Sequence, residues 1–289
     1  IKGPLAAQLY GAARALERGR PPGDVWVTAV VQEEIGGLGA RHLITHLGTD
    51  LVVVGEPSSN ELRRGHRGRV ELEVRVEGRS AHASMPDAGR NPLPTLGRFL
   101  SRLEAVETPE HPDLGTATIA PTRITTEPAS TNVVPERAVL TCDSRVIPDQ
   151  SVEALRTELA DLLRACLAPG LDGVVAIPTF TRRSYKALEM EIPADMSPFV
   201  LPEDHPALRS AVDVLTAALG ERPPVGVWRF ATDGGHFADA GMTVVGFGPG
   251  DEELAHTVDE SLGIAELEVA VDAYDSLVRE WPAALAARV

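Results

Sequence analysis

Three acidic residues follow two apolar runs of the sequence. Glu33 and Glu34 come shortly after DVWVTAVV, and Glu56 follows LVVVG. Both runs are typical of strands buried on both faces of a parallel sheet covered by helices. The carboxyl ends of such strands meet at one edge, where open α/β folds bind their ligands. Three carboxylates gathered there repel one another unless cations neutralise them, so the pattern predicts a metal site.

A histidine near the C-terminus joins this set. His256 lies in GFGPGDEELAHTVDE, the loop that follows a third apolar run. An imidazole together with carboxylates is a ligand set that suits zinc or a similar divalent ion. The alternative is that Glu33, Glu34 and His256 are solvated surface residues, which is the usual position of isolated Glu and His side chains.

The surrounding pattern alternates between helix and strand. IKGPLAAQLYGAARALERG is a helix pattern, residues 25–31 form a valine-rich strand pattern, EIGGLGARHLITHLG is a second helix pattern, and TDLVVVG is a second strand. The alternation resumes with a helix in HPALRSAVDVLTAALG, a strand in GMTVVGFG and a long final helix. This order predicts an α/β fold: a doubly wound, mainly parallel sheet.

A different pattern interrupts this fold near Gly68. In RVELEVRVEG apolar and charged residues alternate, which is typical of a strand with one wet face in an antiparallel sheet. The following segments give the order β-α-β-β-α-β, a split βαβ sandwich of the α+β type. We therefore predict an inserted domain at residues 66–183 and a discontinuous domain at residues 1–65 and 184–289.

The composition narrows the possible partners. The 289 residues carry a formal net charge of −15, which disfavours binding to nucleic acid or to anionic membranes. No apolar run approaches the roughly 20 residues that span a bilayer. The two cysteines have no CxxC spacing and indicate reduced core thiols, so we expect a cytoplasmic protein. Because the sequence starts at Ile1, within a helix pattern, we expect a fragment or a processed chain, and a signal peptide would lie outside it.

Five motifs occur in an order that resembles a known family. They are VVQEEIGGLGA, VVVGEPS, GRSAHASMPDAGRNP, STNVVPERA with DSRVIP, and GFGPGDEELAHTVDE. Together they resemble the family of acetylornithine deacetylase, succinyl-diaminopimelate desuccinylase, aminoacylase and carboxypeptidase G. The resemblance covers nearly the whole chain. It implies a catalytic α/β domain, a smaller lid domain that usually dimerises, and two Zn²⁺ (or Co²⁺ or Mn²⁺) ions in each complete active site.

The resemblance also implies roles for residues of the catalytic domain. Glu33 matches the general base, Glu34 and Glu56 match zinc ligands, and His256 matches a histidine ligand. The segment TDGG, with Asp233 and Gly234, matches a loop that lines the substrate pocket.

Three residues of the inserted domain match lid residues. His82 matches a catalytic histidine that reaches the substrate or oxyanion, often in the partner subunit, and Asn132 and Arg145 match residues that hold the substrate. A guanidinium fork suits a carboxylate. The alternatives are that His82 and Asn132 cap turns and that Arg145 pairs with Asp143 or Asp149.

The sequence departs from the family pattern at its start. The family also uses a His-x-Asp motif and a later aspartate that bridges both metals. The bridging aspartate normally sits directly before a segment like IKGPLAA, with which this sequence begins, so these positions are not in this sequence. We therefore expect Ile1 to lie close to the predicted metal site. We predict a zinc-dependent amidohydrolase, of the deacetylase or desuccinylase type, that cleaves an N-acyl amino acid or short peptide with a free carboxylate. The rival interpretations are a dipeptidase or aminopeptidase and a non-catalytic dimeric pseudoenzyme.

Overall fold

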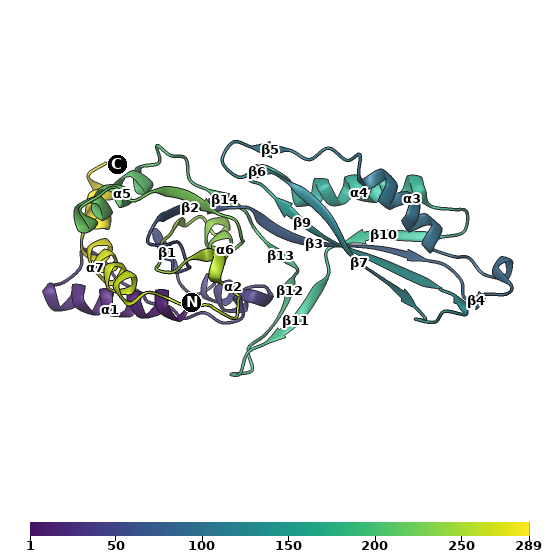
Figure 1. Ribbon diagram of the computed structural model, residues 1–289, viewed down its shortest axis with the longest axis horizontal. Coiled ribbons are helices and arrows are strands. Elements are labelled where there is room, and N and C mark those ends of the chain that lie inside the picture. Colours follow the sequence, from purple (N-terminus) through teal and green to yellow (C-terminus); the bar gives the residue numbers. More distant parts are fainter. Residues whose placement is uncertain (289) are drawn as a thin grey trace. The chain divides into compact units, whose positions relative to one another are not determined.

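A computed structural model describes residues 1–288, and these form two compact units. Unit 1 comprises residues 1–66 and 197–288, and unit 2 comprises residues 67–196. Both units are drawn in Figure 1. The chain returns to unit 1 at residue 197, later than the predicted residue 184. The reason is that β13 (Asp195–Met196) still pairs with a strand of unit 2.

A mixed sheet forms the centre of unit 1. Its order is β1-β16-β2-β14, and β15 also pairs with β2. The pairs β1/β16 and β15/β2 are parallel, whereas β16/β2 and β14/β2 are antiparallel. The α/β class is therefore confirmed, but the sheet contains as many antiparallel as parallel pairs. The strands are β1 (Leu51–Val54), β2 (Leu62–His66), β14 (Phe199–Val200), β15 (Val225–Trp228) and β16 (Thr243–Gly246).

Helices cover both faces of this sheet. In β16 the side chain of Val245 packs with α1, α5 and α7, and that of its neighbour Val244 packs with α2 and α6. Successive strand residues point to opposite faces, so the sheet is doubly wound. The helices are α1 (Lys2–Arg18), α2 (Leu38–Leu43), α5 (Pro206–Leu219), α6 (Gly234–Asp239) and α7 (Ile264–Ala286).

One predicted strand of unit 1 is wrong. Residues 25–31 form no strand, although their valine-rich pattern predicts one. Trp26 is 65% exposed, and the valines among these residues are between 36% and 39% exposed. A strand needs a neighbour to pair its backbone groups, and no strand of the described residues pairs with this segment. The apolar pattern alone cannot supply that neighbour.

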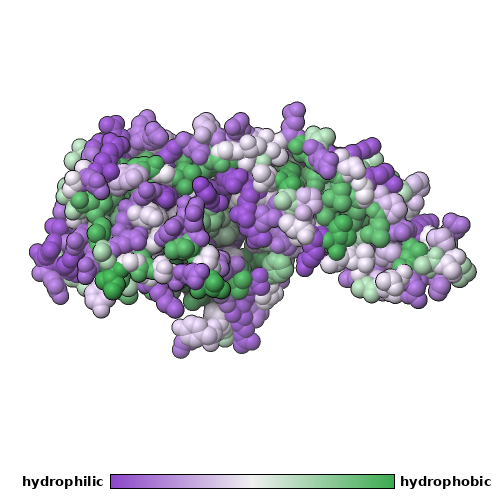
Figure 2. All heavy atoms as spheres, in the orientation of Figure 1, coloured by the Kyte–Doolittle hydropathy of each residue, from purple (hydrophilic) through white to green (hydrophobic). Residues whose placement is uncertain are grey.

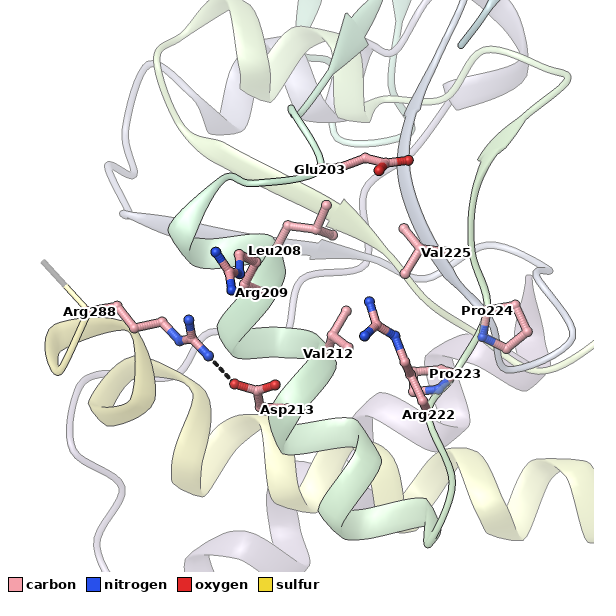
Figure 3. A pocket seen from close by; sticks show the side chains of 10 residues that line it. All are labelled: Glu203, Leu208, Arg209, Val212, Asp213, Arg222, Pro223, Pro224, Val225 and Arg288. Atoms are coloured by element: carbon pink, nitrogen blue, oxygen red, sulfur yellow. Dashed lines mark hydrogen bonds and ion pairs between the residues drawn. The ribbon is translucent and has the colours of Figure 1, made fainter.

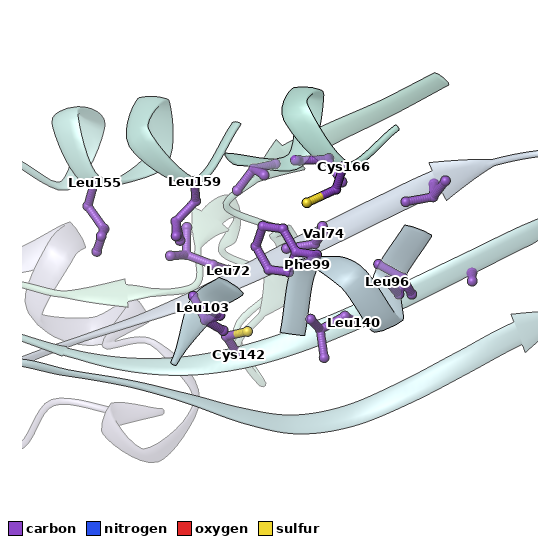
Figure 4. Close-up of a cluster of buried hydrophobic side chains, with 14 of the residues drawn as sticks. Leu72, Val74, Leu96, Phe99, Leu103, Leu140, Cys142, Leu155, Leu159 and Cys166 are labelled. Carbon is purple, nitrogen blue, oxygen red and sulfur yellow. The ribbon is translucent and has the colours of Figure 1, made fainter. Parts of the chain in front are cut away.

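Unit 2 confirms the split βαβ prediction. Its sheet has the order β10-β3-β9-β7 with antiparallel neighbours throughout. In β3 the residues Val70, Leu72, Val74 and Val76 are buried and alternate with more exposed ones. They pack against two helices in a core that includes both cysteines (Figure 4). The elements are β3 (Gly68–Glu77), α3 (Leu93–Leu103), β7 (Thr118–Glu127), β9 (Arg137–Val146), α4 (Val152–Cys166) and β10 (Asp172–Ala176).

Short elements complete the description. Three two-stranded ribbons belong to unit 2: β4 with β8, β5 with β6, and β11 with β12. No helix among residues 1–288 is both long and apolar enough to cross a bilayer. The face shown in Figure 2 mixes hydrophilic residues with hydrophobic ones, and hydrophobic residues gather in a patch on unit 2. The ribbons and the 3-10 turns have the bounds β4 (Ala81–His82), β5 (Glu110–His111), β6 (Gly115–Thr116), β8 (Val133–Val134), β11 (Thr179–Arg183), β12 (Glu189–Pro193), η1 (Glu33–Ile35), η2 (Pro86–Ala88) and η3 (Glu252–Leu254).

Candidate active site

A tight turn positions the Glu33–Glu34 pair. Both residues lie in η1, which begins after Gln32 and ends at Gly36. Gly37 then adopts φ 71°, a left-handed conformation that favours glycine. An added Cβ on Gly37 would lie 2.4 Å from Asp233 Oδ1, so the turn packs closely against the start of α6. Only glycine fits at this point.

Two parallel strands deliver the next candidates to one edge of the sheet. Val54 at the end of β1 is in register with Gly246 at the end of β16. Glu56 follows the first strand, and the loop that carries His256 follows the second. Gly248 holds the two loops together, because an added Cβ there would lie 2.5 Å from the carbonyl oxygen of Glu56.

His256 and Glu34 meet at the surface of unit 1. His256 Nε2 lies 2.8 Å from Glu34 Oε1, and the two side chains are 73% and 68% exposed. His256 also has a φ of 62°, which is uncommon for a residue other than glycine. Two predicted metal ligands that are 222 positions apart in the sequence are thus in direct contact.

The carboxyl groups of this site disturb one another's ionisation. Burial, followed by the charges of Glu56, Asp233 and Glu34, raises the pKa of Glu33 to about 8. Burial likewise raises the pKa of Glu56 to about 7, although the amine of Ile1 and His256 act in the opposite direction. The carboxylates therefore share one electrostatic environment that favours a bound proton or cation.

Ile1 lies near this group, as the sequence predicts. An added Cβ on Gly248 would lie 2.5 Å from the carbonyl oxygen of Glu56 and 3.3 Å from the Cβ atom of Pro4, so the start of α1 packs against the loop that carries Glu56.

Asp233 is a further member of the acidic group. It is 4% exposed, and neither carboxylate oxygen has a hydrogen-bond partner among the described residues. Burial raises the pKa of Asp233 to about 6, although Arg41 opposes this effect. Gly234, the other predicted residue of this loop, is buried at the start of α6. The structure therefore joins Asp233 to the Glu33 cluster.

His236 was not predicted and is buried beside this group. It is 4% exposed, and its Nε2 atom has no hydrogen-bond partner among residues 1–288. Burial, Arg41 and His66 lower the pKa of His236 to about 3, so its imidazole is neutral at pH 7. An added Cβ on Gly37 would lie 2.8 Å from this Nε2 atom as well. The only sequence signal was its place directly after TDGG.

The atoms of Glu34, Glu56 and His256 are of the types that bind a divalent cation, but their positions meet the requirements of a metal site only in part. Glu34 and His256 are adjacent, and Glu56 is coupled electrostatically to both. Carboxylate oxygens and an imidazole nitrogen are ligands that zinc accepts. Nevertheless, the described residues contain no group of three His, Cys, Asp or Glu side chains arranged to hold a metal ion. The chain thus presents two adjacent donors with a third carboxylate nearby.

In unit 2 the backbone brings His82 and Asn132 together. His82 in β4 is in register with Val133 in β8, and the carbonyl oxygen of Asn132 accepts a hydrogen bond of 2.9 Å from the amide of Ala83. Both side chains are exposed. His82 Nδ1 lies 2.7 Å from Ser84 Oγ, and Asn132 Oδ1 accepts a 2.7 Å hydrogen bond from Ser130 Oγ. Both side chains therefore also have the local turn contacts of the alternative interpretation.

Arg145 lies apart from these two residues. It is near the end of β9, whereas Asn132 precedes β8 and the start of β9. Its Nε atom donates a 2.8 Å hydrogen bond to Asp143 Oδ1, and Arg69 donates a 2.6 Å hydrogen bond to the other oxygen of that carboxylate. The pairing with Asp143 named as an alternative is therefore present, and the described structure does not bring Arg145 to Asn132.

Known proteins resemble this chain in sequence and in one domain. Residues 64–170 match the family model described as a peptidase dimerisation domain. The chain is 28% identical to the uncharacterized protein YgeY of Escherichia coli K12, over 88% of this chain and 64% of that protein. It is 28% identical to a putative succinyl-diaminopimelate desuccinylase of Mycobacterium tuberculosis H37Rv, over 84% and 62%. The chain thus spans less than two thirds of the length of these curated relatives.

Solved structures share the fold. A tripeptidase of Staphylococcus aureus superposes with a TM-score of 0.72 at 19% identity, covering 96% of this chain and 70% of that one. The M20 family metallo-carboxypeptidase of Sulfolobus solfataricus gives a TM-score of 0.68 at 15% identity, with 98% and 76% covered. The chain therefore shares its fold with M20 family structures, and its residues 64–170 match a peptidase dimerisation domain.

Proposed function

We propose that the chain is the larger part of a metal-dependent amidohydrolase that cleaves the amide bond of an N-acyl amino acid. The observation that carries the proposal is the group of Glu33, Glu34, Glu56 and His256 at the sheet edge, where burial and mutual repulsion raise the pKa values of Glu33 and Glu56. Perturbed ionisation of grouped carboxylates is typical of catalytic and metal sites.

Glu34, His256 and Glu56 are the residues that would hold divalent metal, with two Zn²⁺ ions expected in a complete site. The M20 family is one of metallopeptidases, which supports a divalent ion, and the choice of zinc is part of the proposal. A bound divalent ion supplies Lewis acidity at the scissile carbonyl and lowers the pKa of the attacking water.

Glu33 is the proposed general base. Its carboxylate takes a proton from the water as the water oxygen bonds to the carbonyl carbon. The same carboxyl group then gives this proton to the departing nitrogen as the C–N bond breaks, which leaves a carboxylic acid and a free amine. Burial raises the pKa of this carboxyl group, which helps it to hold the proton between the two steps.

Four further residues are proposed to hold the substrate, and one to assist catalysis. Asp233 and Gly234 would line the pocket beside Glu33, which is supported by the action of the Asp233 charge on Glu33. Asn132 and Arg145 of unit 2 are proposed to bind the substrate, with Arg145 binding its carboxylate through a bidentate fork. His82, exposed on β4, is proposed to contact the oxyanion.

A peptidase is the second candidate function. The folds of a tripeptidase and of the aminopeptidase PepT from Bacillus cereus both match this chain, the latter with a TM-score of 0.73 at 16% identity and with 98% of this chain and 71% of that one covered. An N-acyl amino acid and a dipeptide share an amide bond followed by a free carboxylate, so the same chemistry serves both.

We also propose a homodimer that forms through unit 2. The matched family model is a dimerisation domain, and it spans β7, a long edge strand of the unit 2 sheet.

The free cysteines Cys142 and Cys166 are buried, which supports a reducing, cytoplasmic compartment.

A substrate panel tests the proposed function. The full-length gene product, supplied with zinc, cobalt or manganese, is assayed with N-acetyl and N-succinyl amino acids and with dipeptides, and amine release is measured. Glu33→Gln should lower turnover by about 10²- to 10⁴-fold. A preparation that binds metal and releases no amine from any member of the panel contradicts the proposal and favours a non-catalytic binding protein.

A further inference from the structure

A second concave site lies in unit 1, among residues that the proposed hydrolysis does not use. The cavity has a volume of about 480 Å³, a size typical of small-molecule pockets. Figure 3 shows it between α5, the loop that follows this helix and the end of the chain. Its lining residues are Glu203, Leu208, Arg209, Val212, Asp213, Arg222, Pro223, Pro224, Val225 and Arg288.

Three arginines line this cavity in a chain whose net charge is −15. One of them, Arg288, forms an ion pair with Asp213 (Figure 3). The other acidic lining residue, Glu203, lies 3.7 Å from Arg64. Each carboxylate of the cavity therefore already has a cationic partner.

Arg209 and Arg222 are the two arginines of the cavity that remain without an acidic partner among the described residues. Neither forms a hydrogen bond or an ion pair with any side chain within residues 1–288. Arg209 projects from α5, whereas Arg222 points from the following loop towards Val212 (Figure 3). Guanidinium groups on two walls of one cavity match an anion, because each can donate two hydrogen bonds to a carboxylate or a phosphate.

The walls between these arginines are apolar and firmly held. Leu208 and Val212 are 2% and 6% exposed and share one face of α5, one helical turn apart. The opposite wall contains Pro223 and Pro224, whose rings restrict the backbone. The carbonyl oxygen of Pro224 accepts a 3.0 Å hydrogen bond from the amide of Leu62, which fixes this wall to the sheet. The cavity is thus built in advance of a ligand.

We propose that this cavity binds a small organic anion. The carboxylate or phosphate head of the ligand contacts Arg209 and Arg222, and its apolar body packs against Pro224 and Val225. None of the residues proposed for hydrolysis lines the cavity, so the ligand occupies a site of its own.

Calorimetric titration of the chain tests this site with matched probes. Phenyl phosphate and phenylacetate each combine an anionic group with an apolar ring, whereas inorganic phosphate has only the anionic group. We expect one phenyl compound to bind at one site per chain, about tenfold or more tightly than inorganic phosphate, because only it buries apolar area. Arg209→Gln or Arg222→Gln should weaken this binding about tenfold or more, which is the effect of losing one charged hydrogen bond.

Three further variants make the outcome decisive. Arg20→Gln removes the same charge from an exposed position of unit 1 and should bind like the wild type. Arg222→Lys keeps the charge and loses the fork, so it should bind less tightly than the wild type even if a glutamine variant fails to fold. Glu33→Gln should bind normally, which separates this site from the proposed active site. The proposal is overturned if neither phenyl compound binds, or if the Arg209 and Arg222 variants bind as well as Arg20→Gln.

Discussion

At the scale of single residues, Glu33 connects ionisation with stability. Its pKa is raised from 4.5 to about 8 in the folded chain, chiefly by burial. A carboxyl group with a raised folded pKa stabilises the fold below its unfolded pKa, and this contribution is lost as the pH rises through the folded value. In metal-free protein the folded state should therefore lose stability between pH 4.5 and pH 8.

Replacement of Glu33 by glutamine should abolish its part of this loss. Glu33→Gln should unfold like the wild type near pH 4.5 and be more stable above pH 8, by on the order of a few kcal/mol. Urea unfolding at both pH values in the presence of a chelator measures the difference. Glu17→Gln, at an exposed position of α1, is the control. Equal effects of the two substitutions would show that the fold does not raise the pKa of Glu33.

Arg145 offers a second prediction, because its guanidinium already binds Asp143 through a 2.8 Å hydrogen bond. If Arg145 also binds the substrate carboxylate, Arg145→Lys should weaken the preference for a free acid over the corresponding amide by about tenfold, since lysine lacks the fork. Comparing kcat/KM for the two substrates isolates this preference from any loss of stability. An undiminished preference would leave Arg145 as a structural partner of Asp143.

At the scale of elements, adjacent valines in β10 allow a matched test of the unit 2 core. Val175 is 1% exposed and belongs to the core, whereas its neighbour Val174 is 49% exposed. Val175→Ala should lower the free energy of unfolding by roughly 1–3 kcal/mol, because it removes buried methyl groups and leaves a cavity. Val174→Ala changes strand propensity equally and should cost much less. Denaturant unfolding of both variants decides whether this face is the packed one.

Elements that carry their own periodicity were the ones that the sequence predicted well. The alternation in β3 and the amphipathic patterns of α3 and α4 depend on local burial, and the structure contains all three. The failures depend on distant partners. Residues 25–31 are apolar yet form no strand, because no described strand lies beside them to pair with. Conversely, β2 has the sequence LRRGH. Its two arginines do not predict a buried strand, yet all of its residues are buried.

The candidate site divides in the same way. The contact between Glu34 and His256 agrees with the predicted grouping, although the apolar run before Glu33 forms no strand. The neutral imidazole of His236 is not predictable, since its buried position depends on the packing of α6 against the Gly37 turn.

At the scale of the whole molecule, the number of donors limits how much metal this chain can hold. Glu34 and His256 are in contact and Glu56 is coupled to them, but no group of three ligands is assembled among residues 1–288. We therefore expect at most one weakly bound zinc ion at this site. Calorimetric titration with zinc should show that His256→Ala lowers the affinity about tenfold or more, in keeping with the loss of a ligand. His46→Ala, at an exposed position of the same unit, should leave it unchanged.

The last prediction concerns the proposed homodimer. The β7 strand is ten residues long, lies at one edge of the unit 2 sheet and is mostly exposed. Such an edge presents unpaired backbone groups that can pair with a second copy about a two-fold axis. Ile124 on this strand is 46% exposed and is in register with the buried Leu140, so it adds an apolar contact at the edge of the core.

A negative charge on this edge should separate the two copies. Ile124→Asp places like charges on paired strands near the two-fold axis, which is destabilising, and should raise the dimer dissociation constant about tenfold or more. Val174→Asp is the matched control, because it alters a similarly exposed aliphatic residue on β10, the opposite edge strand. Light scattering over a range of concentrations measures both constants. A wild-type chain that stays monomeric, or a larger effect of the β10 substitution, would remove β7 from the dimer interface and with it the means by which His82 could serve a neighbouring subunit.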